Sequence, residues 1–263
     1  SPWPPQHHLS RNRGHHVSVA LPSKRLYPTA FEKRRLLVAL LCRPATSFDR
    51  AALSMSQLTN HLVIFAKAPR LGTVKSRLAV DLGAVEACRL YRQMAERTIR
   101  VLSGDPRWQT YLALTPDKDA FSGFNLSAPM LARMAQGQGD LGERMDRVFK
   151  ALAPGPVVIV GTDLPDINTE KVARAFKALG NHDAVIGPAG DGGYWLIGLK
   201  RRPKIASIFD NVRWSNTETL ADTIGNIERE ILGARIKKLE QLDDIDDIES
   251  YQKWQKKNDR NNI

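Results

Sequence analysis

The stretch VVIVGTDLPDINTE, residues 157–170, decides the fold because it joins a buried strand to the start of a helix. Val157–Val160 is a continuous β-branched run, which is typical of a strand covered on both faces. Asn168 or Thr169 can cap the helix that follows. A strand covered on both faces needs helices on both sides of its sheet, so this stretch predicts a layered α/β structure.

Strand-like and helix-like segments alternate on both sides of this stretch. We expect strands at 62–66, 108–114, 184–186, 194–199 and 235–239, and helices at 84–102, 141–152, 217–228 and 245–256. This alternation predicts an α/β fold, with an open and mainly parallel sheet that carries helices on both faces. No internal repeat or second folded domain is indicated.

Length and charge divide the chain unequally. With 263 residues, 42% of them hydrophobic, the chain suits one domain, which we expect at 55–258 with a tail at 259–263. Residues 1–54 hold nine Lys and Arg against two Asp and Glu, and the remaining residues hold 30 against 26. Because most of the net charge of +11 lies in the first segment, it does not indicate a specific nucleic-acid partner.

The first 54 residues are predicted to be a disordered basic extension. They are rich in Pro, His, Ser and Arg and sustain no strand or helix period. The basic residues 33–35 precede a short apolar run at 36–42, so the segment is either a targeting signal or a non-native addition. No apolar run approaches the roughly 18–20 residues of a membrane span. Cys42 and Cys88 lack metal or disulfide spacing, and we expect a reducing, cytoplasmic location.

Ligands of open α/β sheets bind beyond the carboxyl ends of the strands, so the loops after each apolar run are informative. The first such loop follows the strand expected at 62–66 and contains Gly72, Lys75 and Arg77. A glycine permits close backbone approach, and two cations favour an anion, so the loop predicts a phosphate site. It does not match the Walker A spacing, and a solvated basic turn is the alternative.

The second such loop begins with Asp163, directly after the buried strand at 157–160. A carboxylate at this position is unfavourable unless it is paired or bound to a metal ion. Asp163 is therefore a candidate ligand for Mg²⁺ or Mn²⁺, shared with substrate phosphates. Simple turn hydrogen bonds are the alternative.

The third loop, within GPAGDGGYWLIG at 187–198, contains Asp191, Gly192 and Gly193 between two expected strands. Asp191 is either a second metal ligand or a partner for a substrate hydroxyl. The glycines also suit a plain hairpin turn.

A fourth stretch, QGQGDLGERM at 136–145, leads into a helix. Gln136 offers a donor and an acceptor for a base edge, and Gly139, Asp140, Leu141 and Gly142 form a flexible turn that permits contact with a ring or ribose. Asp140 can alternatively serve only as a helix cap.

Five motifs occur in a fixed order, namely FAKAPRLGTVKSRL, QGQGDLGERM, GTDLPD, GPAGDGGYWLIGL and VRWSNTETL. Over about residues 61–250 the chain resembles the DUF2064 family, also called radical-SAM/selenodomain-associated transferase 1. That family belongs to the nucleotide-diphospho-sugar transferase superfamily, whose relatives include MobA-like and 2-phospholactate guanylyltransferases. The resemblance implies a GT-A-like fold.

The resemblance also implies roles for individual residues. Catalysis would rest on Asp163, Lys75 and Arg77, with Asp163 and Asp191 as metal ligands. The implied nucleotide-binding residues are Ala66, Lys67, Gly72, Thr73, Lys75, Arg77, Gln136, Gly139, Asp140, Leu141 and Gly142. The implied acceptor-binding residues are Asp191, Gly192, Gly193, Tyr194, Trp214 and Ser215.

Two departures from the family pattern limit these roles. Asn216 replaces the threonine of the Trp-Ser-Thr segment, and Trp214 is either a stacking residue or a core residue. The late Asp-Val-Asp-Thr element is present as Asp244-Ile245-Asp246-Asp247 without its Thr-Pro. Capping of the last helix by Asp246 or Asp247 is favoured there over a metal role.

Together these features predict a transferase that depends on Mg²⁺ or Mn²⁺ and uses a nucleotide-activated donor, foremost a glycosyltransferase. Its partners would be a nucleotide-sugar or an NTP and a small-molecule acceptor. The run Lys75-Ser76-Arg77-Leu78 resembles the Lys-Ser-Arg-Leu of guanylyltransferases, so a nucleotidyltransferase that releases pyrophosphate is the first alternative. A non-catalytic nucleotide-binding module is the second.

Overall fold

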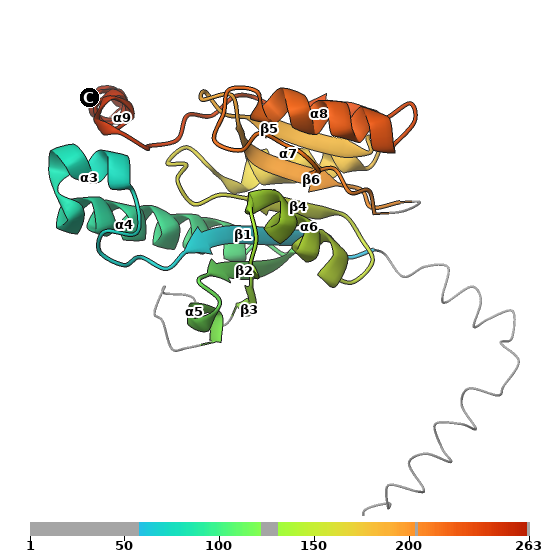
Figure 1. Cartoon of the computed structure of the whole chain (residues 1–263), viewed down its shortest axis with the longest axis horizontal. Coiled ribbons are helices and arrows are strands. Elements are labelled where there is room, and N and C mark those ends of the chain that lie inside the picture. The colour runs from blue at the N-terminus through green and yellow to red at the C-terminus, as the bar shows by residue number, and fades with distance from the viewer. Residues whose placement is uncertain (1–57, 122–130, 203–204, 262–263) are drawn as a thin grey trace, which may run out of the picture. The chain divides into compact units, whose positions relative to one another are not determined.

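The structure is a computed structural model that describes residues 58–121, 131–202 and 205–261, all within one compact unit of residues 57–263. The extension expected at 1–54 lies outside the described residues. The elements shown in Figure 1 are β1 (His61–Lys67), α3 (Ser76–Leu82), α4 (Ala84–Ser103), β2 (Gln109–Thr115), α5 (Lys118–Phe121), β3 (Ala132–Ala135), α6 (Leu141–Ala151), β4 (Val157–Val160), α7 (Thr169–Leu179), β5 (Ala184–Pro188), β6 (Tyr194–Leu199), α8 (Thr219–Glu230), β7 (Ile236–Lys238) and α9 (Ile248–Asn261).

The described strands form one seven-stranded sheet in the order β3-β2-β1-β4-β6-β5-β7. β1 pairs in parallel with β2 and β4, whereas β6 is antiparallel to both of its neighbours. The predicted open, mainly parallel α/β sheet is therefore confirmed. Because β6 runs the opposite way, its start lies at the same sheet edge as the ends of β4 and β5.

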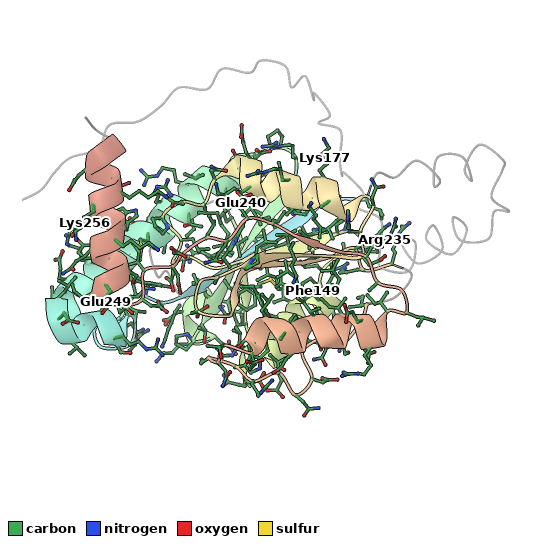
Figure 2. The ribbon with its side chains drawn as sticks, turned by 90° about the horizontal axis from the view of Figure 1, so that it is seen from above. Phe149, Lys177, Arg235, Glu240, Glu249 and Lys256 are labelled. Carbon is green, nitrogen blue, oxygen red and sulfur yellow. The ribbon has the colours of Figure 1, made fainter. Side chains whose placement is uncertain are left out.

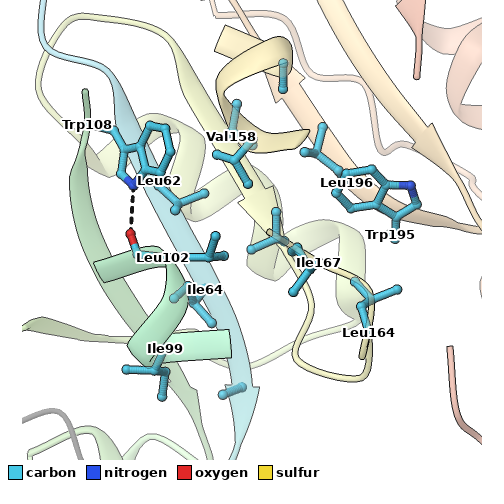
Figure 3. Close-up of a cluster of buried hydrophobic side chains, with 14 of the residues drawn as sticks. Leu62, Ile64, Ile99, Leu102, Trp108, Val158, Leu164, Ile167, Trp195 and Leu196 are labelled. Carbon is cyan, nitrogen blue, oxygen red and sulfur yellow. Dashed lines mark hydrogen bonds between the residues drawn. The ribbon is translucent and has the colours of Figure 1, made fainter. Parts of the chain in front are cut away.

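Helices cover both faces of the sheet, as the buried strand at 157–160 predicts. Leu62 and Ile64 of β1 point to the face that α4 and α7 cover. Val63 points to the opposite face, where α6 and α8 pack. On the face covered by α4 and α7, the indole of Trp108 packs in the hydrophobic core and donates to the Leu102 carbonyl at 3.0 Å (Figure 3).

The helices α6 and α7 begin at side-chain caps that the sequence contains. The Asn168 side chain accepts from the Lys171 backbone N–H at the start of α7, so Asn168 rather than Thr169 is the cap. Asp140 and Glu143 form a reciprocal capping box at the start of α6. These caps fix where the loops after β3 and β4 end.

The structure contains three short elements that the sequence pattern does not predict, namely α3, α5 and β3. The last helix also begins at Ile248 rather than at 245, and it extends to Asn261, past the expected domain end at 258. It begins late because the backbone N–H of Ile245 donates to the Asp163 carbonyl at 3.2 Å, which draws this segment to the end of β4. None of the helices in the described ranges is long and apolar enough to cross a membrane.

Candidate active site

Two neighbouring cavities open at the carboxyl edge of the sheet. The first, here called the basic cavity, has a volume of about 500 Å³, and its lining includes Lys67, Lys75 and Arg77. The second, here called the acidic cavity, has a volume of about 240 Å³, and its lining includes Asp191 and Asp244. Leu141, Gly161 and Asp163 line both cavities, so the end of β4 forms the wall between them.

A buried lysine lies at this wall. The ammonium of Lys75 is 3.0 Å from Asp163 Oδ2 and 2.5 Å from Asp246 Oδ1, and its side chain is only 3% exposed. Burial lowers the pKa of Lys75, but the two carboxylates outweigh this effect and raise the pKa above its ordinary value. The loop that is predicted to bind phosphate thus contacts the aspartate at the end of β4 directly, through Lys75 and Asp163.

The pKa of Asp163 is also shifted by its surroundings. Burial raises its pKa, the Lys75 ammonium lowers it, and the balance leaves the pKa above the ordinary range. Its Oδ1 atom is buried without a hydrogen-bond partner among the described residues. A buried acceptor without a partner is costly in a folded protein, so this oxygen has capacity for a ligand.

The backbone conformation of Lys75 positions its side chain at this wall. Lys75 is the residue before α3 and adopts the left-handed conformation, with φ 50° and ψ 46°. That conformation is uncommon for a residue other than glycine, asparagine or aspartate, and it marks a position that its surroundings hold in place. Two neighbours of Lys75 in sequence supply that hold, because Val74 and Leu78 are both buried.

A second ion pair fixes the start of the same loop. The guanidinium of Arg70 donates to both oxygens of Asp119, at 3.1 Å and 2.5 Å. Asp119 is buried at the start of α5, and the Thr73 hydroxyl donates to the Arg70 carbonyl at 3.0 Å. The loop is therefore held to the sheet before it reaches Lys75.

Tyr91 of α4 lines the basic cavity and was not predicted from the sequence. Its hydroxyl accepts from the Lys67 backbone N–H at 2.7 Å and donates to the Lys67 carbonyl at 2.9 Å. The Thr162 hydroxyl also donates to it at 3.3 Å, and burial raises the pKa of Tyr91. Tyr91 thereby connects the end of β1 to the end of β4, and no local sequence pattern signals that role.

The predicted nucleotide-binding residues divide into two groups. Those that line the basic cavity are Ala66, Lys67, Thr73, Lys75, Arg77, Gln136 and Leu141. Those outside its lining are Gly72, Gly139, Asp140 and Gly142. Members of the second group have structural roles, since Gly72 turns the loop at φ 71° and Asp140 caps α6.

Gln136 lies in the basic cavity, but its amide nitrogen is already used. It donates to the Ala66 carbonyl at 3.1 Å and to the Ala113 carbonyl at 2.9 Å. These bonds connect the segment after β3 to β1 and β2. Only the amide oxygen of Gln136 is left for the base-edge contact predicted from the sequence.

Most of the predicted acceptor-side residues line the acidic cavity, namely Asp191, Gly193, Tyr194, Trp214 and Ser215. Gly192 does not line it; a Cβ at this glycine would lie 2.4 Å from the Thr217 backbone, so the position needs glycine for packing. Asp191 Oδ1 also accepts from the Gly193 N–H at 2.9 Å. The loop is thus both a tight turn and part of the cavity wall.

Trp214 lies between the acidic cavity and the core, so the stacking role stays a prediction. It lines the acidic cavity, and its ring lies 6.1 Å from that of Phe209. A Cβ at Gly142 would lie 2.6 Å from the Trp214 ring, so the absence of a side chain at Gly142 makes room for the indole. Gly142 therefore shapes the cavity indirectly.

The loop between β7 and α9 supplies two further carboxylates to the cavities, those of Asp244 and Asp246. Asp246 pairs with Lys75, whereas Asp247 caps α9 by accepting from the Ser250 backbone N–H at 2.9 Å. The capping role was thus right for Asp247 and wrong for Asp246, because the loop turns toward Asp163 before the helix begins. Asp244 lines the acidic cavity, where burial, Asp246 and Asp191 raise its pKa to about 7. The acidic run directly after the last strand was the available signal for both residues.

The carboxylates suit a divalent cation only in part. No three His, Cys, Asp or Glu side chains within the described ranges lie close enough together to form a complete metal site. Two carboxylates nevertheless surround one cation, the Lys75 ammonium, and Asp163 retains a buried oxygen without a partner. This donor set fits Mg²⁺ or Mn²⁺ held by one or two carboxylates together with phosphates from a substrate.

Comparison with known proteins finds a family match for the middle of the chain. Residues 98–216 match the family described as "Uncharacterized protein conserved in bacteria (DUF2064)". This segment includes Asp163, Asp191 and Trp214 but not the loop of Lys75 and Arg77. A search of curated proteins found no match.

Among solved structures, the chain is similar to a "putative nucleotide-diphospho-sugar transferase" from Desulfovibrio desulfuricans G20. The two are 28% identical, with 73% of this chain and 84% of the other covered and a TM-score of 0.64. A glucosyl-3-phosphoglycerate synthase from Mycobacterium tuberculosis, solved with Mn²⁺ and UDP, shares 12% identity over 76% of each chain at a TM-score of 0.47. A 4-diphosphocytidyl-2C-methyl-D-erythritol synthase from Anaerococcus prevotii shares 14% identity over 73% of this chain and 94% of the other at 0.46.

The similarities to the glucosyl-3-phosphoglycerate synthase and the erythritol synthase are too distant to bear on function. The similarity to the protein from Desulfovibrio desulfuricans supports the GT-A-like fold, and it confirms the enzyme class at the coarse level of a transferase. Residues 98–216 match the DUF2064 family, which agrees with the resemblance seen in the motifs.

Proposed function

We propose that this chain is a metal-dependent transferase that binds a nucleotide-activated donor in the basic cavity and an acceptor in the acidic cavity, and that it transfers a sugar. The observation that carries this proposal is the Lys75–Asp163 ion pair of 3.0 Å at the wall between the two cavities. A group that leaves a diphosphate on one side of this wall would reach an acceptor on the other side by the shortest route.

The chain's own residues would bind and orient the donor. Arg77 is exposed at the mouth of the basic cavity, and Lys67 lies at the end of β1, so both can reach phosphate oxygens. Lys75 would add positive charge at the bond that breaks, where preorganised cations stabilise the growing negative charge of the leaving diphosphate. Tyr91 and the Arg70–Asp119 pair would hold these groups in place without touching the donor.

Asp163 would hold the divalent ion, with Asp191 as the second protein ligand. When bound, Mg²⁺ or Mn²⁺ would neutralise charge on the diphosphate and raise its quality as a leaving group. Asp163 then faces both substrates, because it lines both cavities.

The test measures binding of UDP and GDP, each with Mn²⁺, by isothermal titration calorimetry on the full chain and on Asp163→Asn. We expect Mn²⁺ to strengthen binding of at least one nucleotide to the unmodified chain, and Asp163→Asn to remove most of that gain. The matched control is Asp105→Asn, whose carboxylate pairs with Arg107 in the turn before β2, away from both cavities. Equal Mn²⁺-dependent binding by Asp163→Asn and the control would refute the metal assignment.

A nucleotidyl transfer is the second candidate, because Ser76 and Arg77 of the Lys-Ser-Arg-Leu run both line the basic cavity. In that case the acceptor would attack the α-phosphate of an NTP and pyrophosphate would leave. Pyrophosphate released from any of the four NTPs with small acceptors would favour this candidate, whereas release of NDP from a nucleotide-sugar would favour the first.

A further inference from the structure

The charge around the acceptor side differs from that around the donor side. Three carboxylates line the acidic cavity, those of Asp163, Asp191 and Asp244, and the lining contains no Lys or Arg among the described residues. The basic cavity, in contrast, is lined by three cationic side chains and two carboxylates, those of Asp163 and Asp246, so its cations are in excess. The two sides of the wall therefore favour ligands of different charge.

A third cavity continues the acidic side. It has a volume of about 660 Å³ and lies between α9 and the loops at 165–166, 190–191 and 241–245. Asp191 and Asp244 line both this cavity and the acidic cavity, so the two are neighbours across these side chains. We call it the α9 cavity, after the helix that provides Trp254 to its wall.

The α9 cavity has cations, but they are already paired. The Lys253 ammonium lies 2.6 Å from Asp243, and the Lys257 ammonium lies 2.6 Å from Asp166. Each of these four side chains lines the cavity, together with Asp191 and Asp244. Its lining thus has more carboxylates than ammonium groups, and an anionic ligand would have to displace an existing ion pair.

We infer that the acceptor is an uncharged polyhydroxylated molecule, such as a sugar or another polyol, that binds in the acidic cavity and extends into the α9 cavity. This inference rests on the proposed function. It excludes phosphorylated and carboxylated acceptors, which need a free cation on the acceptor side.

A bound divalent ion would not reverse this preference. The described carboxylates that line the two acceptor-side cavities outnumber their ammonium groups by three, and the raised pKa of Asp244, about 7, leaves that group only partly ionised near neutral pH. Two positive charges at Asp163 would therefore bring the lining close to neutral. The ion would also be shared with the donor diphosphate, which brings negative charge of its own. An anionic acceptor would therefore meet the negative charge of the donor and find no unpaired lysine or arginine among the described lining residues.

The chemistry of the walls suits hydroxyl groups. Ionised carboxylates accept hydrogen bonds from hydroxyls, and Ser215, Asn216 and Gln241 provide further polar groups along the two cavities. Trp214 and Trp254 offer apolar ring surface for the C–H faces of a sugar. Aromatic surface with hydroxyl acceptors around it describes a polyol site rather than a phosphate site.

The test compares glucose with glucose 6-phosphate as probes of the full chain, by saturation-transfer NMR at low ionic strength with Mn²⁺ and the nucleotide that binds best. We expect glucose to bind saturably, and glucose 6-phosphate to bind more weakly by about tenfold or more. Added salt should narrow the gap, because it screens the repulsion. Equal or tighter binding of the phosphorylated probe would overturn the inference, and so would a lack of saturable binding by both probes.

Variants locate the probe on the molecule. Trp254→Leu should weaken glucose binding by about fivefold. Gln241→Ala, an exposed position on the cavity wall, should weaken it without any loss of core packing. Lys256→Ala is the matched control, because Lys256 is exposed on the same helix and lies outside the lining of all three cavities (Figure 2). Unchanged glucose binding by both test variants would overturn the extension into the α9 cavity.

The outcomes separate the two proposals. Normal binding of nucleotide with Mn²⁺ together with a preference for glucose 6-phosphate would refute the acceptor class and leave the proposed function intact. Failure of every nucleotide to bind the unmodified chain would refute the proposed function, whatever the sugar probes show.

Discussion

Replacement of Lys75 by methionine tests the central contact of the site. Methionine is similar to lysine in length and is unbranched, so it removes the charge with little change in packing. The left-handed backbone at position 75 is equally unfavourable for both residues, so strain does not differ between them. The main effect of the substitution is therefore the loss of the Lys75 ammonium, which forms ion pairs with both Asp163 and Asp246.

The expected loss of stability follows from the exposure of the partners. Removal of one partner of a fully buried ion pair costs about 3–5 kcal/mol, because a charge is left buried and unpaired. The side chains of Asp163 and Asp246 are 37% and 42% exposed, so water can compensate part of the loss. We therefore expect Lys75→Met to lower the free energy of unfolding by about 1–3 kcal/mol.

The assay is urea unfolding followed by tryptophan fluorescence, with and without Mn²⁺. A domain of this size should lose roughly 2–4 °C of melting temperature for each kcal/mol, which thermal unfolding can check. Mn²⁺ should stabilise Lys75→Met more than the unmodified chain, because an ion held at Asp163 would compensate a carboxylate charge that has lost its ammonium partner. The matched control is Lys253→Met, since that ion pair is 76% and 49% exposed and should contribute at most about 1 kcal/mol.

Two results would refute this reasoning. Lys75→Met as stable as the control would mean that the ion pair is not a stabilising contact. An equal effect of Mn²⁺ on the unmodified chain and on Lys75→Met would mean that the ion does not compensate the charge of Asp163.

Three further predictions follow from neighbouring contacts. Asp119→Asn should lower the free energy of unfolding by about 1–3 kcal/mol in urea, because it weakens the paired bond from Arg70; an unchanged midpoint would contradict this. Gly142→Ala should lower it by about 1–2 kcal/mol and shift Trp214 fluorescence, because a Cβ would lie 2.6 Å from the indole; full stability would show that the ring moves freely. The pKa of Asp244 is raised to about 7, so its folded form binds more protons than the unfolded chain and stability falls as pH rises from about 4 to 7. Asp244→Asn should flatten that fall in urea titrations at several pH values, and an unchanged slope would exclude Asp244 as its source.

Local patterns in the sequence were sufficient for most of the architecture. The β-branched run at 157–160 and the cap at Asn168 are properties of neighbouring residues, and both were correctly read. The short helices α3 and α5 and the edge strand β3 were missed, since so few residues carry little periodic signal and tertiary packing holds them.

The outcome for the site was different. Asp163 and Lys75 lie in loops that follow strand ends, and they were predicted as site residues because the fold class fixes that edge as the place where ligands bind. Glycines of the same loops were overinterpreted, since Gly72 and Gly192 are needed for the backbone and do not line the cavities. A glycine-rich motif predicts where the chain turns, but it does not predict whether the turn lines a cavity.

The sequence by itself determined the longer helices and strands, their order, and which loops share the edge of the sheet where ligands are expected, because these depend on local periodicity and on the rules of parallel sheets. Only the tertiary structure decided that Asp246 pairs with Lys75 across 171 positions of sequence, and that Tyr91 joins the ends of two strands. The tertiary structure also decided the division into a basic and an acidic cavity. Such contacts are made between segments far apart in the chain, and no short-range pattern specifies the distance between them.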